Sequence, residues 1–180
     1  MVNDGDMVLC RVNAPLVSEC FRFLKAGRKA IIRGRDIGQG LISTVKKMKA
    51  ANVADLIGKL SDWLHSETAK ENAKRNPSET KLIGLADRFD CLSCFAESAT
   101  TVDGVIAKIE SVFSDTNGSG IVLSSVHKSK GLEADRVFLL QPEKATIPHP
   151  MAKTAWQRDQ EMNLLYVGIT RAKHELVHVS

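Results

Sequence analysis

The stretch from Ile121 to Glu133 constrains the fold more than any other part of this sequence. It opens with an apolar run that is typical of a buried strand, and it then changes into a polar loop with two lysines and a glycine. An apolar helical pattern over Asn163–Ala172 follows and carries Arg171 near its end. A strand-end loop with backbone donors, joined by a guanidinium from another segment, is what a phosphate-binding site requires.

Strand and helix patterns alternate at both ends of the chain. An apolar helix pattern starts at Pro15, where a proline in the first turn costs little, and a longer helix is predicted over 155–172. Residues 33–40 are predicted to form a glycine-rich turn before another helix. Such alternation predicts an α/β fold with a mostly parallel sheet. The predicted strands cover residues 7–12, 30–33, 121–126, 137–141 and 175–179.

The middle of the chain reads as helical throughout. Asn52 is a candidate helix cap, Asn76-Pro77-Ser78 breaks the pattern, and Thr100 with Asp103 matches a capping box. The apolar stripes of these helices indicate a core. The sequence therefore predicts one α/β domain built from residues 1–40 and 119–180, interrupted by an all-helical insertion over 41–118.

Composition narrows the class of protein. The chain has 180 residues, 43% of them hydrophobic, and a net charge of +4, which permits a nucleic-acid partner without requiring one. No apolar run approaches the roughly 18 residues of a membrane span, and the polar N-terminus is unlike a secretory signal. We therefore expect a cytoplasmic protein with no membrane partner. Cys91 and Cys94 form a single C-x-x-C pair, which is a weak zinc or redox signal, and no metal site is predicted.

Candidate chemical groups follow the predicted strands. In open parallel sheets ligands gather at the carboxyl ends of strands, where Arg11 follows the first strand. A loop with Gly131 lets backbone N–H groups approach an anion, and Glu133 can accept a hydrogen bond from a ribose hydroxyl. Each group also has an ordinary explanation: a solvated turn for the loop, a helix cap for Glu133, and a structural role for His127. The polar residues after the third strand include Ser125, His127, Lys128, Gly131 and Glu133.

Arg171 is predicted to end a helix that is buried on most sides, with Leu164, Leu165, Val167 and Ile169 as its apolar residues. A buried arginine needs a partner, although a cation that satisfies the helix C-terminus explains it equally. The sequence contains no G-x-x-x-x-G-K-[ST] phosphate loop, and no predicted strand ends in the acidic pair that holds magnesium. We therefore expect that the chain alone cannot bind the phosphates and the metal ion of a nucleoside triphosphate.

Taken together, three segments resemble the C-terminal motor half of superfamily 1 DNA helicases of the UvrD/Rep/PcrA type. Leu9–Ala14 resembles motif IV, Val126–Glu133 resembles motif V, and Glu161–Ala172 resembles motif VI. The resemblance implies a second RecA-like domain, a P-loop NTPase fold that forms one wall of an ATP cleft and part of a single-strand DNA track. It also implies 3′-to-5′ movement and a role in DNA repair or replication.

The resemblance carries residue roles with it. Arg11 and Arg171 match the two arginines that reach the γ-phosphate, which makes them the catalytic candidates, and both belong to the nucleotide-binding set with Gly131 and Glu133. The DNA-facing positions of motif V fall on Ser125, His127 and Lys128. The implied cofactor is ATP with Mg²⁺, held mainly by the first motor domain in cis or in trans, and the implied DNA partner is a single strand or a duplex junction.

The sequence departs from the family pattern at a few positions. Ala134 stands where an aromatic residue is usual, Met162-Asn163 replaces a basic pair, and the helical insertion is shorter than the accessory domain of relatives. Because the chain begins almost at motif IV, we expect it to be a piece of a longer protein and to hydrolyse no ATP by itself.

Two other functions fit the same motifs. The chain could be the motor portion of a helicase–nuclease, since such proteins share motifs V and VI. It could also be a module that binds DNA or a protein partner without ATPase activity. The presence of Arg11, Glu133 and Arg171 together argues against such a degenerate motor, because a module without ATP has no use for two such arginines.

Overall fold

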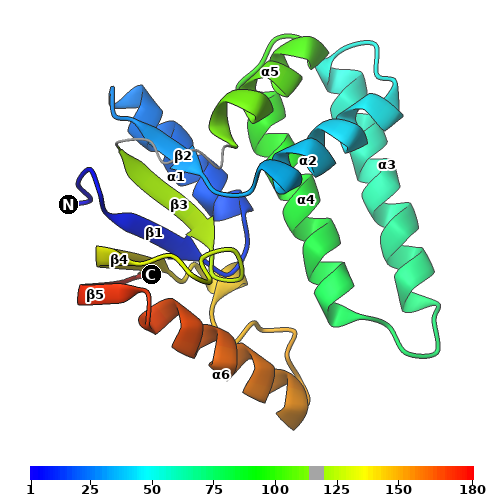
Figure 1. Cartoon of the computed structure of the whole chain (residues 1–180). Coiled ribbons are helices and arrows are strands. Elements are labelled where there is room, and N and C mark those ends of the chain that lie inside the picture. The colour runs from blue at the N-terminus through cyan, green and yellow to red at the C-terminus, as the bar shows by residue number, and fades with distance from the viewer. Residues whose placement is uncertain (114–119) are drawn as a thin grey trace. The chain divides into compact units, whose positions relative to one another are not determined.

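The computed structural model describes residues 1–113 and 120–180, which form two compact units. The sheet unit contains Met1–Gly34 and the described residues 120–180, and the helical unit is Arg35–Phe113 (Figure 1). The predicted turn over 33–40 is wrong beyond Gly34, because α2 (Arg35–Met48) begins directly after it. The boundary between the first segment of the sheet unit and the helical unit therefore lies at residue 34 instead of residue 40.

Five parallel strands form the sheet, in the order β2-β3-β1-β4-β5. This confirms the predicted α/β class and the parallel sheet. The last two strands start earlier than predicted, because Ala134 already pairs with Ala172. The strands are β1 (Met7–Cys10), β2 (Ala30–Ile32), β3 (Ile121–Ser125), β4 (Ala134–Leu140) and β5 (Ala172–Val179).

Helix α1 (Ala14–Lys25) packs against β1, β2 and β3. Pro15 lies in its first turn, where a missing N–H is tolerated. Its apolar residues recur at helical spacing, so one stripe of the helix is removed from water against the sheet. The buried residues of α1 are Leu16, Val17, Cys20 and Phe23.

Helix α6 (Ala155–Ile169) belongs to a second apolar cluster of the sheet unit. Thr154 begins it with a capping box, in which its hydroxyl accepts from the Gln157 N–H and the Gln157 side chain accepts from the Thr154 N–H. The short 3₁₀ helix η1 (Glu143–Ala145) precedes it. The buried members of the cluster are Met7, Leu9, Val126, Ala134, Val137, Leu139, Ile147 and Leu164.

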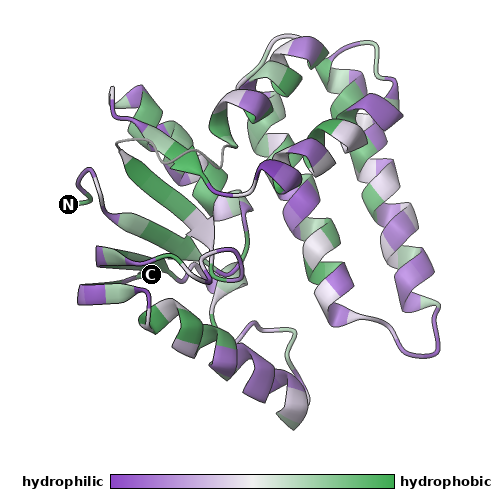
Figure 2. Cartoon of the chain, in the orientation of Figure 1, coloured by the Kyte–Doolittle hydropathy of each residue, from purple (hydrophilic) through white to green (hydrophobic). Residues whose placement is uncertain are grey.

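The burial predicted for α6 is wrong in part. Leu164 is buried and Leu165 and Val167 are partly buried, but Ile169 is exposed. Trp156, Met162 and Tyr166 are exposed as well. The reason is geometric: a helix that lies on a sheet turns one stripe inward, and the stripe here contains Glu161, Leu164 and Gly168. Figure 2 shows the N-terminal turns of α6 as its more hydrophilic part.

The helical unit contains α2, α3 (Val53–Asn72), α4 (Glu79–Glu97) and α5 (Val102–Val112). Asn52 caps α3 as predicted, since its side chain accepts from the Asp55 N–H. The cap of α5 is Thr101 instead of Thr100, because Thr101 Oγ1 accepts from the Gly104 N–H. The predicted break at residues 76–78 is confirmed between α3 and α4, where Ser78 caps α4.

Buried Glu71, near the end of α3, contacts residues of the connection to α4 and of the first turn of α4. Its carboxylate lies 2.7 Å from Lys74 Nζ and 2.8 Å from Lys81 Nζ, and it accepts from the Ser78 N–H at 3.0 Å. Both lysines contact Oε2 and the Ser78 N–H donates to Oε1, so each buried oxygen has a partner and the carboxylate stabilises this turn of the helical unit.

Candidate functional site

The carboxyl ends of β1 and β3 lie side by side and carry the first group of predicted residues. Cys10 is in register with Ser125, and the Val126 N–H donates to Cys10 O at 2.9 Å. The chain then turns sharply, because the Lys128 N–H and the Ser129 N–H both donate to Ser125 O. We call this region the strand-end edge and define it by Arg11, Ser125, His127 and Lys128.

Three of these residues differ in their access to solvent. His127 and Lys128 are exposed, whereas Ser125 is only 5% exposed. Partial desolvation of the imidazole, together with the charge of Arg11, lowers the pKa of His127. His127 is therefore a neutral hydrogen-bonding group at pH 7, and Lys128 is the cation of this group that faces solvent.

Arg11 is held inside the sheet unit by Glu161. Its Nε donates to both carboxylate oxygens of Glu161, at 3.1 and 3.0 Å, and its Nη2 donates to Oε1 at 2.8 Å. Burial alone would raise the pKa of Glu161, but the hydrogen bonds and charge of Arg11 outweigh it and lower the pKa. Both residues are therefore charged at pH 7 and form a buried ion pair.

The second group of predicted residues lies where β4 and β5 begin. The Ala134 N–H donates to Arg171 O at 3.0 Å, which places Arg171 directly before the first paired residue of β5. The Arg171 side chain is partly buried and donates to Val167 O at 2.9 Å and to Leu132 O at 3.1 Å. The structure thus contains the helix-end interaction that was the alternative explanation for this arginine, and it adds a bond to the motif V loop.

Gly131 and Glu133 belong to this second group. Gly131 has φ +86°, a conformation that side chains rarely adopt, and open space lies where a Cβ would stand. Glu133 is exposed, and Lys173 Nζ lies 3.9 Å from its carboxylate. We call Gly131, Glu133 and Arg171 the strand-start edge. It presents an accessible backbone, a carboxylate and a guanidinium within one small region.

The two edges lie at opposite ends of the strands. Arg11 follows Cys10, which is in register with Leu140, whereas Arg171 precedes the partner of Ala134. The seven residues of β4 separate these levels by about 20 Å at roughly 3.3 Å per residue. The expectation that Gly131 and Glu133 lie with Arg11 at the carboxyl ends of the strands is therefore wrong, because both residues lie just before the start of β4. Within this unit the two arginines do not converge on one phosphate.

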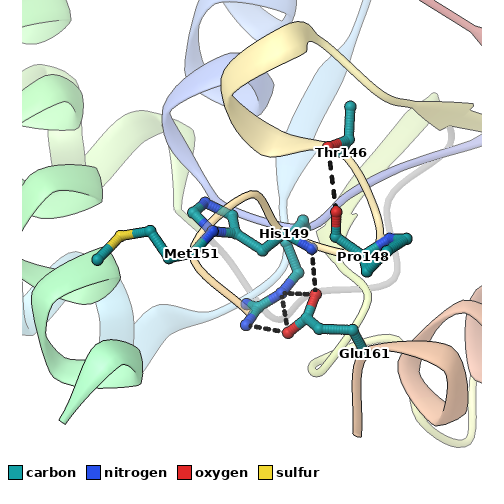
Figure 3. Close-up of polar contacts among 6 residues, drawn as sticks. Thr146, Pro148, His149, Met151 and Glu161 are labelled. Atoms are coloured by element: carbon teal, nitrogen blue, oxygen red, sulfur yellow. Dashed lines mark hydrogen bonds and ion pairs between the residues drawn. The ribbon is translucent and has the colours of Figure 1, made fainter. Parts of the chain in front are cut away.

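Sequence reasoning missed Glu161 and His149. Glu161 is 8% exposed, and besides Arg11 it accepts from the backbone N–H of His149 at 3.1 Å (Figure 3). A signal for Glu161 was present, because an acidic residue at helical spacing from Leu164 and Gly168 occupies a core position and needs a partner. Nothing in the sequence indicates the contact of His149, which depends on the path of the loop.

A hollow of about 360 Å³ in the sheet unit contains none of the predicted site residues. Its apolar lining includes Val8, Phe23, Phe138 and Leu140. Among the described residues, no group of three or more His, Cys, Asp or Glu side chains is arranged to hold a metal ion. None of the helices in residues 1–113 and 120–180 combines the length and apolarity needed to cross a membrane.

The cysteine pair lies in α4 of the helical unit. Cys91 is buried, Cys94 is partly buried, and all four cysteines of the chain carry reduced thiols. Burial and the neighbouring charge of Asp87 raise the pKa of Cys91 well above its ordinary value. Thiolate formation, which both redox exchange and zinc binding require, is therefore disfavoured at Cys91.

The sequence of this chain is similar to a known protein family and to several known proteins. The family model of the UvrD-like helicase C-terminal domain matches residues 17–180. The protein YjcD of Bacillus subtilis is 30% identical over 145 residues, or 75% of this chain and 18% of YjcD. The ATP-dependent DNA helicase PcrA of the same organism is 38% identical over 125 residues, or 64% of this chain and 16% of PcrA. The chain thus spans less than a fifth of these relatives, and it belongs to the UvrD-like helicase C-terminal domain family.

Proposed function

We propose that this chain supplies the second motor domain of an ATP-dependent DNA helicase that moves 3′ to 5′ along single-stranded DNA. In this proposal the strand-start edge faces the nucleotide and the strand-end edge faces the DNA. A first motor domain, in cis or in trans, provides the phosphate loop and the Mg²⁺ site.

The observation that carries the proposal is the environment of Arg171. Its partners among the described residues are neutral oxygens, those of Val167, Leu132 and Thr170. Carbonyl and hydroxyl oxygens fix a guanidinium in direction without cancelling its charge. A fixed and uncompensated cation beside an open glycine backbone fits an anionic group such as a transferring phosphoryl.

The proposed chemistry of the chain is electrostatic. Arg171 stabilises the charge that develops on the phosphoryl oxygens, Gly131 lets the backbone approach the phosphates, and Glu133 accepts a hydrogen bond from the ribose. Because the phosphate loop belongs to another domain, these contacts form only when the two domains close. Closing and reopening of the two domains then change how tightly His127 and Lys128 bind the DNA strand.

The test is Arg171→Ala in the motor that this chain forms with its phosphate-loop domain. We expect DNA-stimulated ATP turnover to fall by a factor of about 100 or more, given the contribution of arginine fingers. The matched control is Arg158→Ala, which removes an arginine from the opposite end of the same helix. Turnover of a folded Arg171→Ala motor within a few-fold of that of the Arg158→Ala control would contradict the proposal.

A further inference from the structure

The ion pair between Arg11 and Glu161 joins three segments that are distant in sequence. Arg11 follows β1, Glu161 lies in α6, and His149 belongs to the loop before α6. The carboxylate accepts three hydrogen bonds from the Arg11 fork and one from the His149 N–H, as Figure 3 shows around Glu161. Arg11 and Glu161 are only 9% and 8% exposed, so their charges satisfy each other inside the sheet unit.

Glu161 occupies a core position of α6. The buried stripe of this helix consists of Glu161, Leu164 and Gly168, at the i, i+3, i+7 spacing of one helical face. Leu164 and Gly168 cover the C-terminal half, so Glu161 is the member of the stripe nearest the start of the helix. The ion pair therefore anchors the N-terminal half of α6 at a place where no buried apolar side chain of the helix does so.

The same helix ends beside the strand-start edge. Arg171 follows α6 by two residues, and its Nε donates back to Val167 O in the last turn. A helix transmits its position along its axis, because each turn is hydrogen-bonded to the next. A shift of α6 at Glu161 would therefore move the direction of the Arg171 guanidinium.

We propose that Arg11 is a positioning residue that, through Glu161, fixes α6 and thereby Arg171, and that it is not a phosphate ligand. This inference rests on the proposed function where the test measures ATP turnover. The effect of Glu161 on the position of Arg171 can be measured on the chain alone. The inference gives Arg11 a role different from the phosphate contact that the family resemblance implies.

The decisive variant is Glu161→Gln in the motor that contains its phosphate-loop domain. If Arg11 positions α6, then Glu161→Gln and Arg11→Gln each lower turnover, by between about tenfold and a hundredfold, as a misplaced catalytic group does. The double variant is then no worse than either single variant, because both remove the same interaction. If Arg11 is instead a phosphate ligand, Glu161→Gln frees it, turnover holds or rises, and the proposal is overturned.

A double variant with two apolar side chains tests whether the single variants lose turnover only because they fail to fold. Arg11→Leu combined with Glu161→Leu replaces the buried ion pair by side chains that can pack in its place. We expect this double variant to fold and to recover turnover above that of Arg11→Gln. A folded double variant whose turnover equals that of Arg11→Gln or lies below it would mean that the guanidinium itself is needed, and the positioning role would be rejected.

Nuclear magnetic resonance of the chain alone separates this inference from the proposed function. The Arg171 Nε–Hε signal reports the bond to Val167 O. We expect Glu161→Gln to shift this signal and to speed its exchange with water, whereas Arg158→Gln leaves it unchanged. An unmoved Arg171 signal in a folded Glu161→Gln chain would refute the positioning role. Absence of ATP turnover in the unaltered motor would refute only the proposed function.

Discussion

The two ends of the sheet hold an arginine in two different ways. At the strand-end edge Arg11 is paired with a carboxylate, and the two charges cancel inside the protein. At the strand-start edge Arg171 is held by carbonyl and hydroxyl oxygens and keeps its charge. The first arrangement is a closed buried ion pair, and the second leaves the cation that the proposed function assigns to the nucleotide. Under the two proposals made above, the partner of each arginine indicates its role better than its place in a motif does.

The largest expected effect on stability concerns the paired end. Glu161→Leu leaves Arg11 buried without its carboxylate, which we expect to lower the free energy of unfolding by about 3–5 kcal/mol. Urea denaturation monitored by circular dichroism measures the loss. The double variant with Arg11→Leu should recover most of it. A loss of under roughly 1 kcal/mol for the single change would show that the buried pair is not an anchor.

A smaller loss of stability is expected at the other end. Arg171→Ala removes hydrogen bonds to Val167 O and Leu132 O from a partly buried side chain. We expect a cost of about 1–2 kcal/mol in the same denaturation experiment. If this variant destabilises the chain as much as Glu161→Leu does, the proposed difference in stability contribution between the Arg11 ion pair and the Arg171 hydrogen bonds is wrong.

Acidification provides a third comparison. The pKa of Glu161 is lowered from its ordinary value of 4.5, so the ion pair contributes stability that is present above pH 4.5 and is lost as the pH falls through the lowered pKa. The difference in unfolding free energy between the unaltered chain and Glu161→Gln should therefore be constant from pH 5 to 7 and shrink below about pH 4.5. A difference that is still undiminished at pH 2 would mean that the charge of Glu161 contributes nothing to stability.

The smallest expected effect concerns DNA at the strand-end edge. Lys128→Ala should weaken binding of the chain to a fluorescein-labelled oligothymidine by a few-fold, and it should reduce the slope of log affinity against log salt by about one. Fluorescence anisotropy at several salt concentrations measures both. Lys25→Ala is the control, because this lysine lies at the end of α1 in the same unit. Equal slopes for the two variants would remove Lys128 from the proposed DNA track.

Local sequence patterns predicted the elements of this fold but not where the elements place the site. The strands and the cap at Asn52 depend on neighbouring residues, so periodicity and capping chemistry were sufficient. The one-residue error at Thr101 arose because two adjacent threonines offer the same hydroxyl. The early start of β4 was not predicted, because Ala134 belongs to the strand only through its pairing with Ala172, which is distant in sequence.

The grouping of the site residues depended on topology. Motif V runs from the end of β3 to the start of β4, so Ser125 and Glu133 lie at opposite ends of the sheet although they are only eight positions apart in the sequence. The residues of one continuous motif therefore fall into two separate groups of candidate residues. The partner of Arg11 could not be predicted for the same reason, since Arg11 and Glu161 are 150 positions apart in the sequence.

The exposed face of α6 has a consequence for handling the protein. Half of the exposed large apolar side chains in the described part of the chain lie on this one helix: Trp156, Met162, Tyr166 and Ile169. Concentrated apolar surface lowers colloidal stability, and the modest net charge of +4 provides little repulsion against it. We expect solutions of the isolated chain to scatter more light as concentration rises, and replacing Tyr166 and Met162 with lysines should extend the usable concentration range.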